Sequence, residues 1–239
     1  MGPEKFVLIV EDIKLVANEI ERLIIEEFPE VETQVAFTAQ QAEQFIRDSR
    51  GKFDFDYVIL DTRLPPSDSV RTPQVYAYEL PEVRWLISEG SHTVVIFNSA
   101  YDDDPRVQQI RKDCTQLPTG DSTTPAARLY YVQKGGDGSY EWIERLLDYL
   151  RRSIHSERIS RNLERMFVGR SASSGYARSA VRGGYSGREQ LGGASDATQS
   201  LAALARDIAQ HWRVLDGTTK QSVQRHFRVE MDGDIVRVS

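Results

Sequence analysis

Residues 57–65 read Tyr-Val-Ile-Leu-Asp-Thr-Arg-Leu-Pro, a short apolar run that ends in Asp61. Three other apolar runs of the chain also lead into polar residues. Because the carboxyl ends of parallel strands meet at one edge of a sheet, such residues are expected to form one ligand site. The other runs and their polar residues are 6–10 with Glu11 and Asp12, 93–97 with Ser99, and 130–133 with Lys134.

Strand and helix signals alternate between residues 5 and 152. Five apolar runs predict strands, and their continuous apolar character is typical of strands that are covered on both faces. The segments between them carry apolar residues at helical spacing. This order predicts an α/β fold with a doubly wound, five-stranded parallel sheet. The predicted strands are 6–10, 31–36, 57–60, 93–97 and 129–133, and the predicted helices are 14–28, 39–49, 81–89, 106–116 and 139–152.

The polar strand ends predict phosphoryl transfer to an aspartate. An aspartate carboxylate can accept a phosphoryl group, and this reaction depends mainly on neutralising charge. A carboxylate cluster attracts Mg²⁺, which prefers oxygen ligands. The expected roles are phosphoacceptor for Asp61; metal binding for Asp12, Asp61, Glu11 (through a water) and the backbone carbonyl of Arg63; and phosphoryl binding for Lys134 and Ser99.

Residues 5–152 resemble a CheY-like receiver domain of two-component response regulators. The resemblance implies a flavodoxin/CheY-like sheet, and Asp61 as the residue that a histidine kinase or phosphotransfer protein phosphorylates with Mg²⁺. It implies a protein that promotes only its own phosphotransfer and dephosphorylation and is not otherwise an enzyme. It further implies that Tyr131 is the switch aromatic and that Tyr101 tunes dephosphorylation. The residues that carry the resemblance are Glu11-Asp12, Asp61, Leu64-Pro65, Ser99-Ala100 and Lys134, in the family's order.

The chain departs from the family pattern in two respects. The family usually has Lys-Pro where this chain has Lys134-Gly135, and the segments on either side of Ser99 are longer than usual. The second long segment surrounds the fourth helix, which belongs to the usual output face. Partner recognition is therefore expected to be atypical. A degenerate receiver, which acts as a scaffold without being phosphorylated, is a separate alternative.

The remainder of the chain predicts a helical extension over 153–168, with a break near 155–158. A flexible linker rich in Gly, Ser and Arg is predicted over 169–199, followed by a small helical module over 200–239. In that module the helical seam comprises Leu201, Leu204, Ile208, Trp212 and Leu215. Thr218 or Thr219 is expected to cap a second helix, and Asp232-Gly233 predicts a hairpin turn.

Two outputs are compatible with this module. The first is a protein-interaction or dimerisation module that presents the seam as an exposed surface, giving a homodimer or binding a downstream protein. The second is a DNA-binding transcriptional output, with residues 218–228 as a recognition helix and the hairpin as a wing. Residues 191–239 carry six basic and six acidic residues, so the module lacks a strongly basic footprint for nucleic acid.

Charge is distributed unevenly along the chain, and the composition gives further expectations. Residues 1–150 carry 15 Lys and Arg against 27 Asp and Glu, whereas residues 151–239 carry 15 against 9. No apolar stretch approaches the roughly 20 residues of a membrane span. The lone Cys114 cannot form an internal disulfide, and it is expected to be a buried helix residue in a reducing, cytoplasmic compartment.

Overall fold

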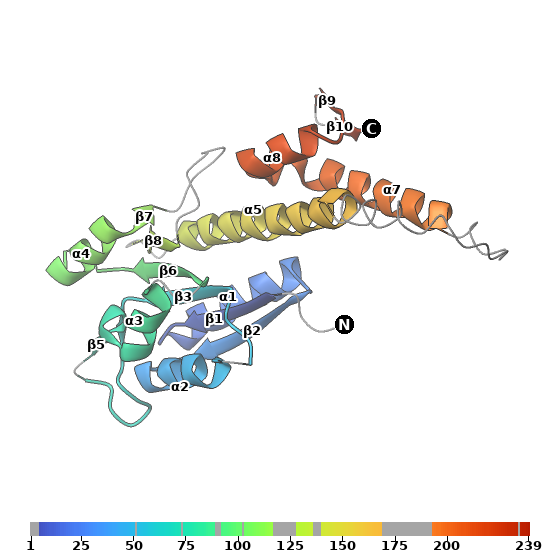
Figure 1. Cartoon of the computed structure of the whole chain (residues 1–239). Helices are drawn as coiled ribbons and strands as arrows, with labels where there is room; N and C mark the ends of the chain where they lie inside the picture. Colours follow the sequence, from blue (N-terminus) through green and yellow to red (C-terminus); the bar gives the residue numbers. More distant parts are fainter. Residues whose placement is uncertain are drawn as a thin grey trace, which may run out of the picture. The chain divides into compact units, whose positions relative to one another are not determined.

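A computed structural model describes the chain in two compact units, Met1–Asp148 and Tyr149–Ser239 (Figure 1). None of the described helices is both long enough and apolar enough to cross a membrane. The described residues are 5–50, 52–72, 74–88, 92–101, 103–116, 128–135, 140–168, 193–233 and 235–239.

The first unit is built on a parallel sheet with the strand order β2-β1-β3-β6-β8-β7. The first five strands in this order give the flavodoxin-like doubly wound arrangement. The predicted fold class is therefore confirmed, with a two-residue strand added at the edge. The strands are β1 (Lys5–Val10), β2 (Val31–Ala36), β3 (Tyr57–Asp61), β6 (Val94–Ser99), β7 (Thr115–Gln116) and β8 (Leu129–Gln133).

Helices connect these strands, and their ends follow local sequence signals. Thr38 caps α2, since its hydroxyl accepts a hydrogen bond from the Gln41 amide at 3.2 Å. Asp104 caps α4 in the same manner, with Pro105 at the first helical position. The helices are α1 (Lys14–Glu27), α2 (Ala39–Ser49), α3 (Pro81–Ile87), α4 (Pro105–Asp113) and α5 (Glu141–Leu163).

Cys114 departs from its expected position. Helix α4 ends at Asp113, so Cys114 follows the helix and is half-buried, because the chain turns there into the short strand β7. Burial, reinforced by the neighbouring Asp113 carboxylate, raises the pKa of the Cys114 thiol to about 12. The thiol is therefore protonated and unreactive at neutral pH.

One hydrophobic core of the first unit lies between the sheet and helices α2, α3 and α4. Figure 1 shows α2 and α3 on the same side of the sheet. Leu8, Leu60 and Phe97 point into this core, whereas the intervening Ile9 and Ile59 are buried on the other face. Beyond β3, the chain forms the small hairpin of β4 (Arg63–Leu64) and β5 (Val75–Tyr76), then η1 (Ala77–Glu79).

The second unit begins within α5, which runs without interruption through the predicted break near 155–158. The shift in apolar register reflects a new environment instead, because Ile159 and Leu163 belong to the core of the second unit. The predicted linker over 169–199 lies mostly outside the described residues, but 193–199 form the start of α7. The further elements are η2, a π-helical turn (Glu164–Val168), α7 (Gly193–His211), η3 (Trp212–Val214), α8 (Gly217–Gln224), β9 (Val229–Asp232) and β10 (Ile235–Val238).

The second unit buries the seam that the sequence analysis expected to be exposed. Leu201 is half-buried and the other seam residues are buried, because the end of α5 and helix α8 supply apolar partners. Asp216, rather than Thr218 or Thr219, caps α8 by accepting a hydrogen bond from the Thr219 amide at 2.7 Å. The predicted hairpin is present, with Gly233 at φ 58° in its turn. The core residues are Ile159, Leu163, Leu204, Ile208, Trp212, Leu215 and Val223.

Candidate functional site

The polar strand ends meet at the carboxyl edge of the sheet in the first unit. Asp61 is the last residue of β3 and Ser99 the last of β6, while Glu11 and Lys134 directly follow β1 and β8. The Lys134 amide donates a hydrogen bond to the Ser99 carbonyl at 2.8 Å, which extends the β6–β8 pairing by one step. The predicted sheet-edge cluster is therefore present.

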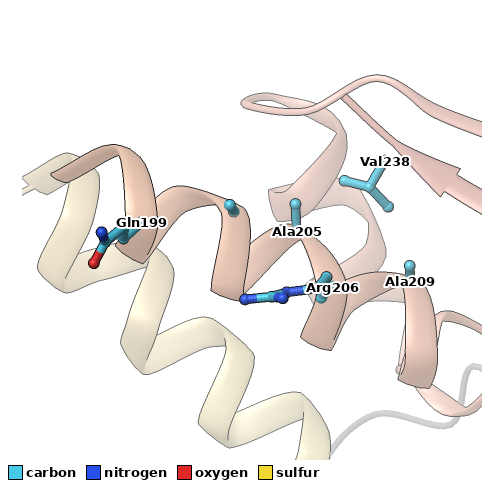
Figure 2. A pocket seen from close by; sticks show the side chains of 6 residues that line it. Gln199, Ala205, Arg206, Ala209 and Val238 are labelled. Carbon is cyan, nitrogen blue, oxygen red and sulfur yellow. The ribbon is translucent and has the colours of Figure 1, made fainter. Parts of the chain in front are cut away.

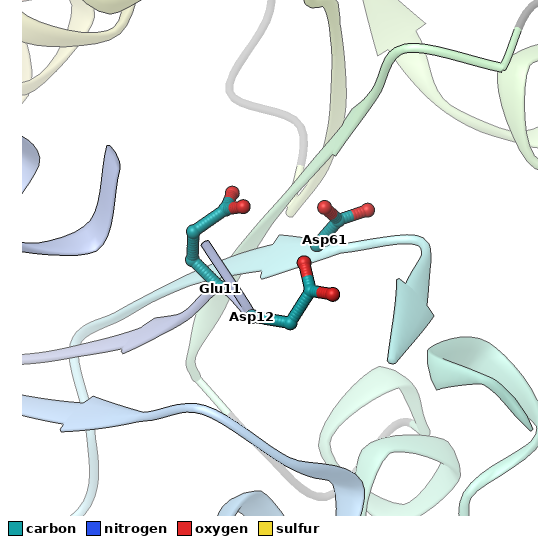
Figure 3. Close-up of side chains that lie close together, drawn as sticks. All are labelled: Glu11, Asp12 and Asp61. Atoms are coloured by element: carbon teal, nitrogen blue, oxygen red, sulfur yellow. The ribbon is translucent and has the colours of Figure 1, made fainter. Parts of the chain in front are cut away.

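Three carboxylates of this edge lie close together, as Figure 3 shows. Oxygen atoms of Glu11, Asp12 and Asp61 all lie within 4.8 Å of one another. Glu11 and Asp61 are buried, while Asp12 is half-buried. Hard divalent cations bind through such oxygen donors, so this donor set suits an ion of that kind. Among the described residues, this is the one cluster of three or more Asp, Glu, His or Cys side chains that could hold a metal ion.

Lys134 supplies the positive charge of this site. Its ammonium donates hydrogen bonds to Glu11 Oε2 at 2.7 Å and to Asp61 Oδ2 at 2.5 Å, and it lies 5.7 Å from the Trp142 ring centre. Burial lowers the pKa of Lys134, but the Asp61 and Glu11 carboxylates outweigh burial and leave this pKa raised. Lys134 therefore remains charged, and it would compete with a bound cation for both carboxylates.

The pKa values of Glu11 and Asp12 are both raised. Burial, aided by the negative charge of Asp61, raises the pKa of Glu11 to about 7, although Lys134 acts in the opposite direction. Burial and Asp61 also raise the pKa of Asp12. Both pKa values are raised because negative charges lie close together where water is largely excluded. A bound divalent cation would lower these pKa values by neutralising that charge.

A pair of hydroxyls lies beside the carboxylates. Thr62 Oγ1 donates to Ser99 Oγ at 2.8 Å, and Ser99 Oγ also accepts a hydrogen bond from the Tyr101 amide at 3.1 Å. Both Thr62 and Ser99 are fully buried. Sequence reasoning identified Ser99 but missed Thr62; a hydroxyl directly after the predicted acceptor was the available signal.

The remaining predicted site residues occupy different surroundings. Tyr131 is fully buried in the core of the first unit, whereas Tyr101 is 45% exposed. The Arg63 amide donates to Asp61 Oδ1 at 3.2 Å. Its guanidinium lies 4.5 Å from the Tyr101 ring centre and 3.9 Å from Asp104, so this side chain is directed away from Glu11, Asp12 and Asp61. The roles of Tyr131, Tyr101 and the Arg63 carbonyl stay predictions.

The second unit contains a surface hollow of about 600 Å³ along α7 and β10 (Figure 2). The described lining residues are mostly small and apolar, and Arg206 is the one charged residue among them, so they include neither a nucleophile nor a metal-binding group. The lining residues are Gln199, Ala202, Ala205, Arg206, Ala209 and Val238.

Comparison with known proteins found similar solved structures. The N-terminal domain of a response regulator/sensory box/GGDEF protein from Carboxydothermus hydrogenoformans is 21% identical, with a TM-score of 0.39 over 62% of this chain and 94% of that one. A receiver domain of a Francisella response regulator is 20% identical, with a TM-score of 0.39 over 63% of this chain and 99% of that one. The HemR receiver domain from Leptospira biflexa is 19% identical, with a TM-score of 0.40 over 61% of this chain and 94% of that one. No protein-family model and no curated protein matches the chain.

Proposed function

We propose that this chain is a two-component response regulator whose first unit receives a phosphoryl group on Asp61. The observation that carries the proposal is the position of the Lys134 ammonium between Asp61 and Glu11, beside the half-buried Asp12. An ammonium and an acidic, cation-binding edge around one acceptor carboxylate supply the charge neutralisation that phosphoryl transfer requires. The order of the polar strand ends, which resembles that of receiver domains, supports the same assignment.

In the proposed reaction, an oxygen of the Asp61 carboxylate attacks the phosphorus atom of the donor. A new oxygen–phosphorus bond forms while the donor's bond to phosphorus breaks, and the electron pair leaves with the donor. The donor is a phosphohistidine of a sensor kinase or phosphotransfer protein, or a small acyl phosphate. Lys134 then stabilises the charge on the transferred group, and Ser99 supplies a hydroxyl. The chain accepts one phosphoryl group and does not turn over a separate substrate.

Mg²⁺ is the proposed cofactor of this step. Asp12, Asp61 and Glu11 would hold the ion, with Glu11 acting through a water, and the Arg63 carbonyl would complete the protein ligands. When bound, the ion neutralises charge on the transferred group. Its binding must also displace a proton from part of the Glu11 population near neutral pH, since the pKa of Glu11 is about 7.

Replacement of the acceptor tests this proposal. In Asp61→Asn, labelling by acetyl phosphate with Mg²⁺ should fall to background, because the amide cannot serve as the attacking oxygen anion. Intact-protein mass spectrometry should show one added phosphoryl group on the wild type and none on the variant. Asp54→Asn is the matched control, since Asp54 is an exposed aspartate that precedes the same strand. Equal labelling of Asp61→Asn and the wild type would refute Asp61 as the acceptor.

For the second unit we propose a protein-interaction or dimerisation module. The proposal now relies on the hairpin rather than on the buried seam, because Met231 and Ile235 are each 57% exposed there. The DNA-binding alternative has the helix and hairpin it requires. However, the hairpin's Arg228 and Arg237 lie within ion-pair distance of Glu230 and Asp232, respectively, which reduces the local positive charge.

Association in solution separates these two outputs. With Mg²⁺ and a non-hydrolysable phosphoryl analogue, the full chain should elute from gel filtration as a dimer, and Met231→Ser/Ile235→Ser should elute as a monomer. A monomeric wild type that binds random duplex DNA with a steep salt dependence would instead establish the DNA-binding alternative. The double serine variant should fold normally, because both side chains are already in solvent.

A further inference from the structure

Asn98 is a buried polar residue at the sheet edge that the proposed mechanism does not yet use. It lies within β6, directly before Ser99, and is fully buried. Both polar atoms of its side chain, Oδ1 and Nδ2, have no hydrogen-bond partner among the described residues. Leaving such an amide unpaired is unfavourable, so its presence at this position calls for a reason.

The strand register places Asn98 beside the acceptor. Asp61 on β3 pairs with Asn98 on β6, and Val10 on β1 pairs with Leu60, which makes Glu11 the next neighbour of Asp61. Leu60 and Phe97 point into the core shared with α2 and α3. Because side chains alternate along a strand, Asp61 and Asn98 both leave the sheet on the opposite face. The order across this face is therefore Glu11, Asp61, Asn98.

The path of the Lys134 side chain connects it to Asn98. Lys134 follows β8, and β6 lies between β8 and β3 in the sheet. Its ammonium nevertheless contacts Asp61 at the end of β3 and Glu11 at the end of β1. The Lys134 side chain therefore extends across the end of β6, the strand that carries Asn98.

We propose that Asn98 is a positioning residue whose amide holds the Asp61 side chain as the phosphoryl group becomes attached, both in the transition state and in the product. This inference rests on the proposed function. Transfer moves the negative charge from the carboxylate to the phosphoryl oxygens, so the ammonium of Lys134 follows that charge. The remaining carbonyl oxygen of Asp61 is then a neutral acceptor, for which the neutral Nδ2 of Asn98 is a matched donor. The unphosphorylated protein thus leaves the amide unpaired, and the phosphorylated protein satisfies it.

The matched variants Asn98→Val and Asn98→Thr test this role, because valine and threonine share a shape and differ in one hydroxyl. Without phosphoryl donor, Asn98→Val should unfold at the same temperature as the wild type or higher, since it removes an unpaired buried amide. With acetyl phosphate and Mg²⁺, its initial labelling rate should fall about five-fold, which corresponds to one hydrogen bond of about 1 kcal/mol. Asn98→Thr should recover part of that rate.

Three results would overturn the inference in distinguishable ways. A lower unfolding temperature of Asn98→Val would show that the amide has a structural partner in the unphosphorylated protein. Labelling of Asn98→Val at the wild-type rate, with Asp61→Asn unlabelled, would remove the positioning role and leave the proposed function intact. An unlabelled wild type would overturn the proposed function and this inference together.

Discussion

Lys134→Met should lower the rate of Asp61 phosphorylation by about 100-fold, while Mg²⁺ binds the variant more tightly than the wild type. The rate falls because one preorganised charge that faces the transferred group is lost. The affinity for Mg²⁺ rises because the Lys134 ammonium no longer competes with the ion for Asp61 and Glu11. Two unit charges 4 Å apart interact by about 4 kcal/mol at an effective dielectric constant of 20, so a gain of at least about tenfold is expected. Acetyl phosphate labelling and calorimetric titration with Mg²⁺ measure the two effects.

The same substitution should reduce stability in a way that Mg²⁺ reverses. Breaking a buried ion pair on one side costs about 3–5 kcal/mol, because the partner charges remain buried. Bound Mg²⁺ should restore much of this free energy of unfolding. Lys5→Met is the matched control, since Lys5 Nζ lies 2.6 Å from Asp56 at the opposite end of β1. It should lose stability without a larger response to Mg²⁺. Wild-type labelling of Lys134→Met would refute the assigned role of Lys134.

Trp212→Ala should remove much of the stability of the second unit. Trp212 is buried among residues from α5, α7 and α8, and a buried Trp→Ala change costs about 3–5 kcal/mol. A unit of this size has a free energy of unfolding of about 5–13 kcal/mol, so the loss is a large fraction of the total. Hydrogen–deuterium exchange should show faster exchange throughout α7 and α8.

The matched substitution Leu201→Ala lies on α7, the helix that leads into η3 and Trp212, but outside this core. Leu201 is half-buried, so its truncation should cost less than about 1 kcal/mol and leave the exchange of α8 unchanged. Equal effects of the two substitutions would contradict the packing described for the second unit. Such a result would favour an exposed seam, as the sequence analysis expected.

The fold of the first unit was predictable because each buried strand is a continuous apolar run bounded by polar residues. The predicted strand over 57–60 and the observed β3 differ by one residue, Asp61. The sheet-edge cluster followed from the same pattern, since parallel strands must bring their carboxyl ends together. Asn98 was missed because the predicted strand over 93–97 ends two residues before the observed end of β6 at Ser99. An amide inside an otherwise apolar strand was the signal for it.

The second unit was less predictable because its contacts join segments that are far apart in the sequence. Ile159 and Val223 cover the seam, and the spacing of apolar residues within the seam predicts neither of these partners. A change of apolar register within α5 was therefore interpreted as a break in the helix. Thr218 or Thr219 was expected to cap the second helix, whereas the Asp216 carboxylate caps it.

The hydrogen bond from the Lys134 amide to the Ser99 carbonyl has a consequence for the proposed switch. The cation and the hydroxyl that would detect the phosphoryl group belong to neighbouring strands joined at that point. The Ser99 hydroxyl is in turn held by Thr62, which directly follows Asp61. A random displacement of one of these side chains is therefore resisted by the others. Under the proposed function, phosphorylation of Asp61 would act on all of them at once, so the arrangement would oppose switching in the absence of phosphorylation.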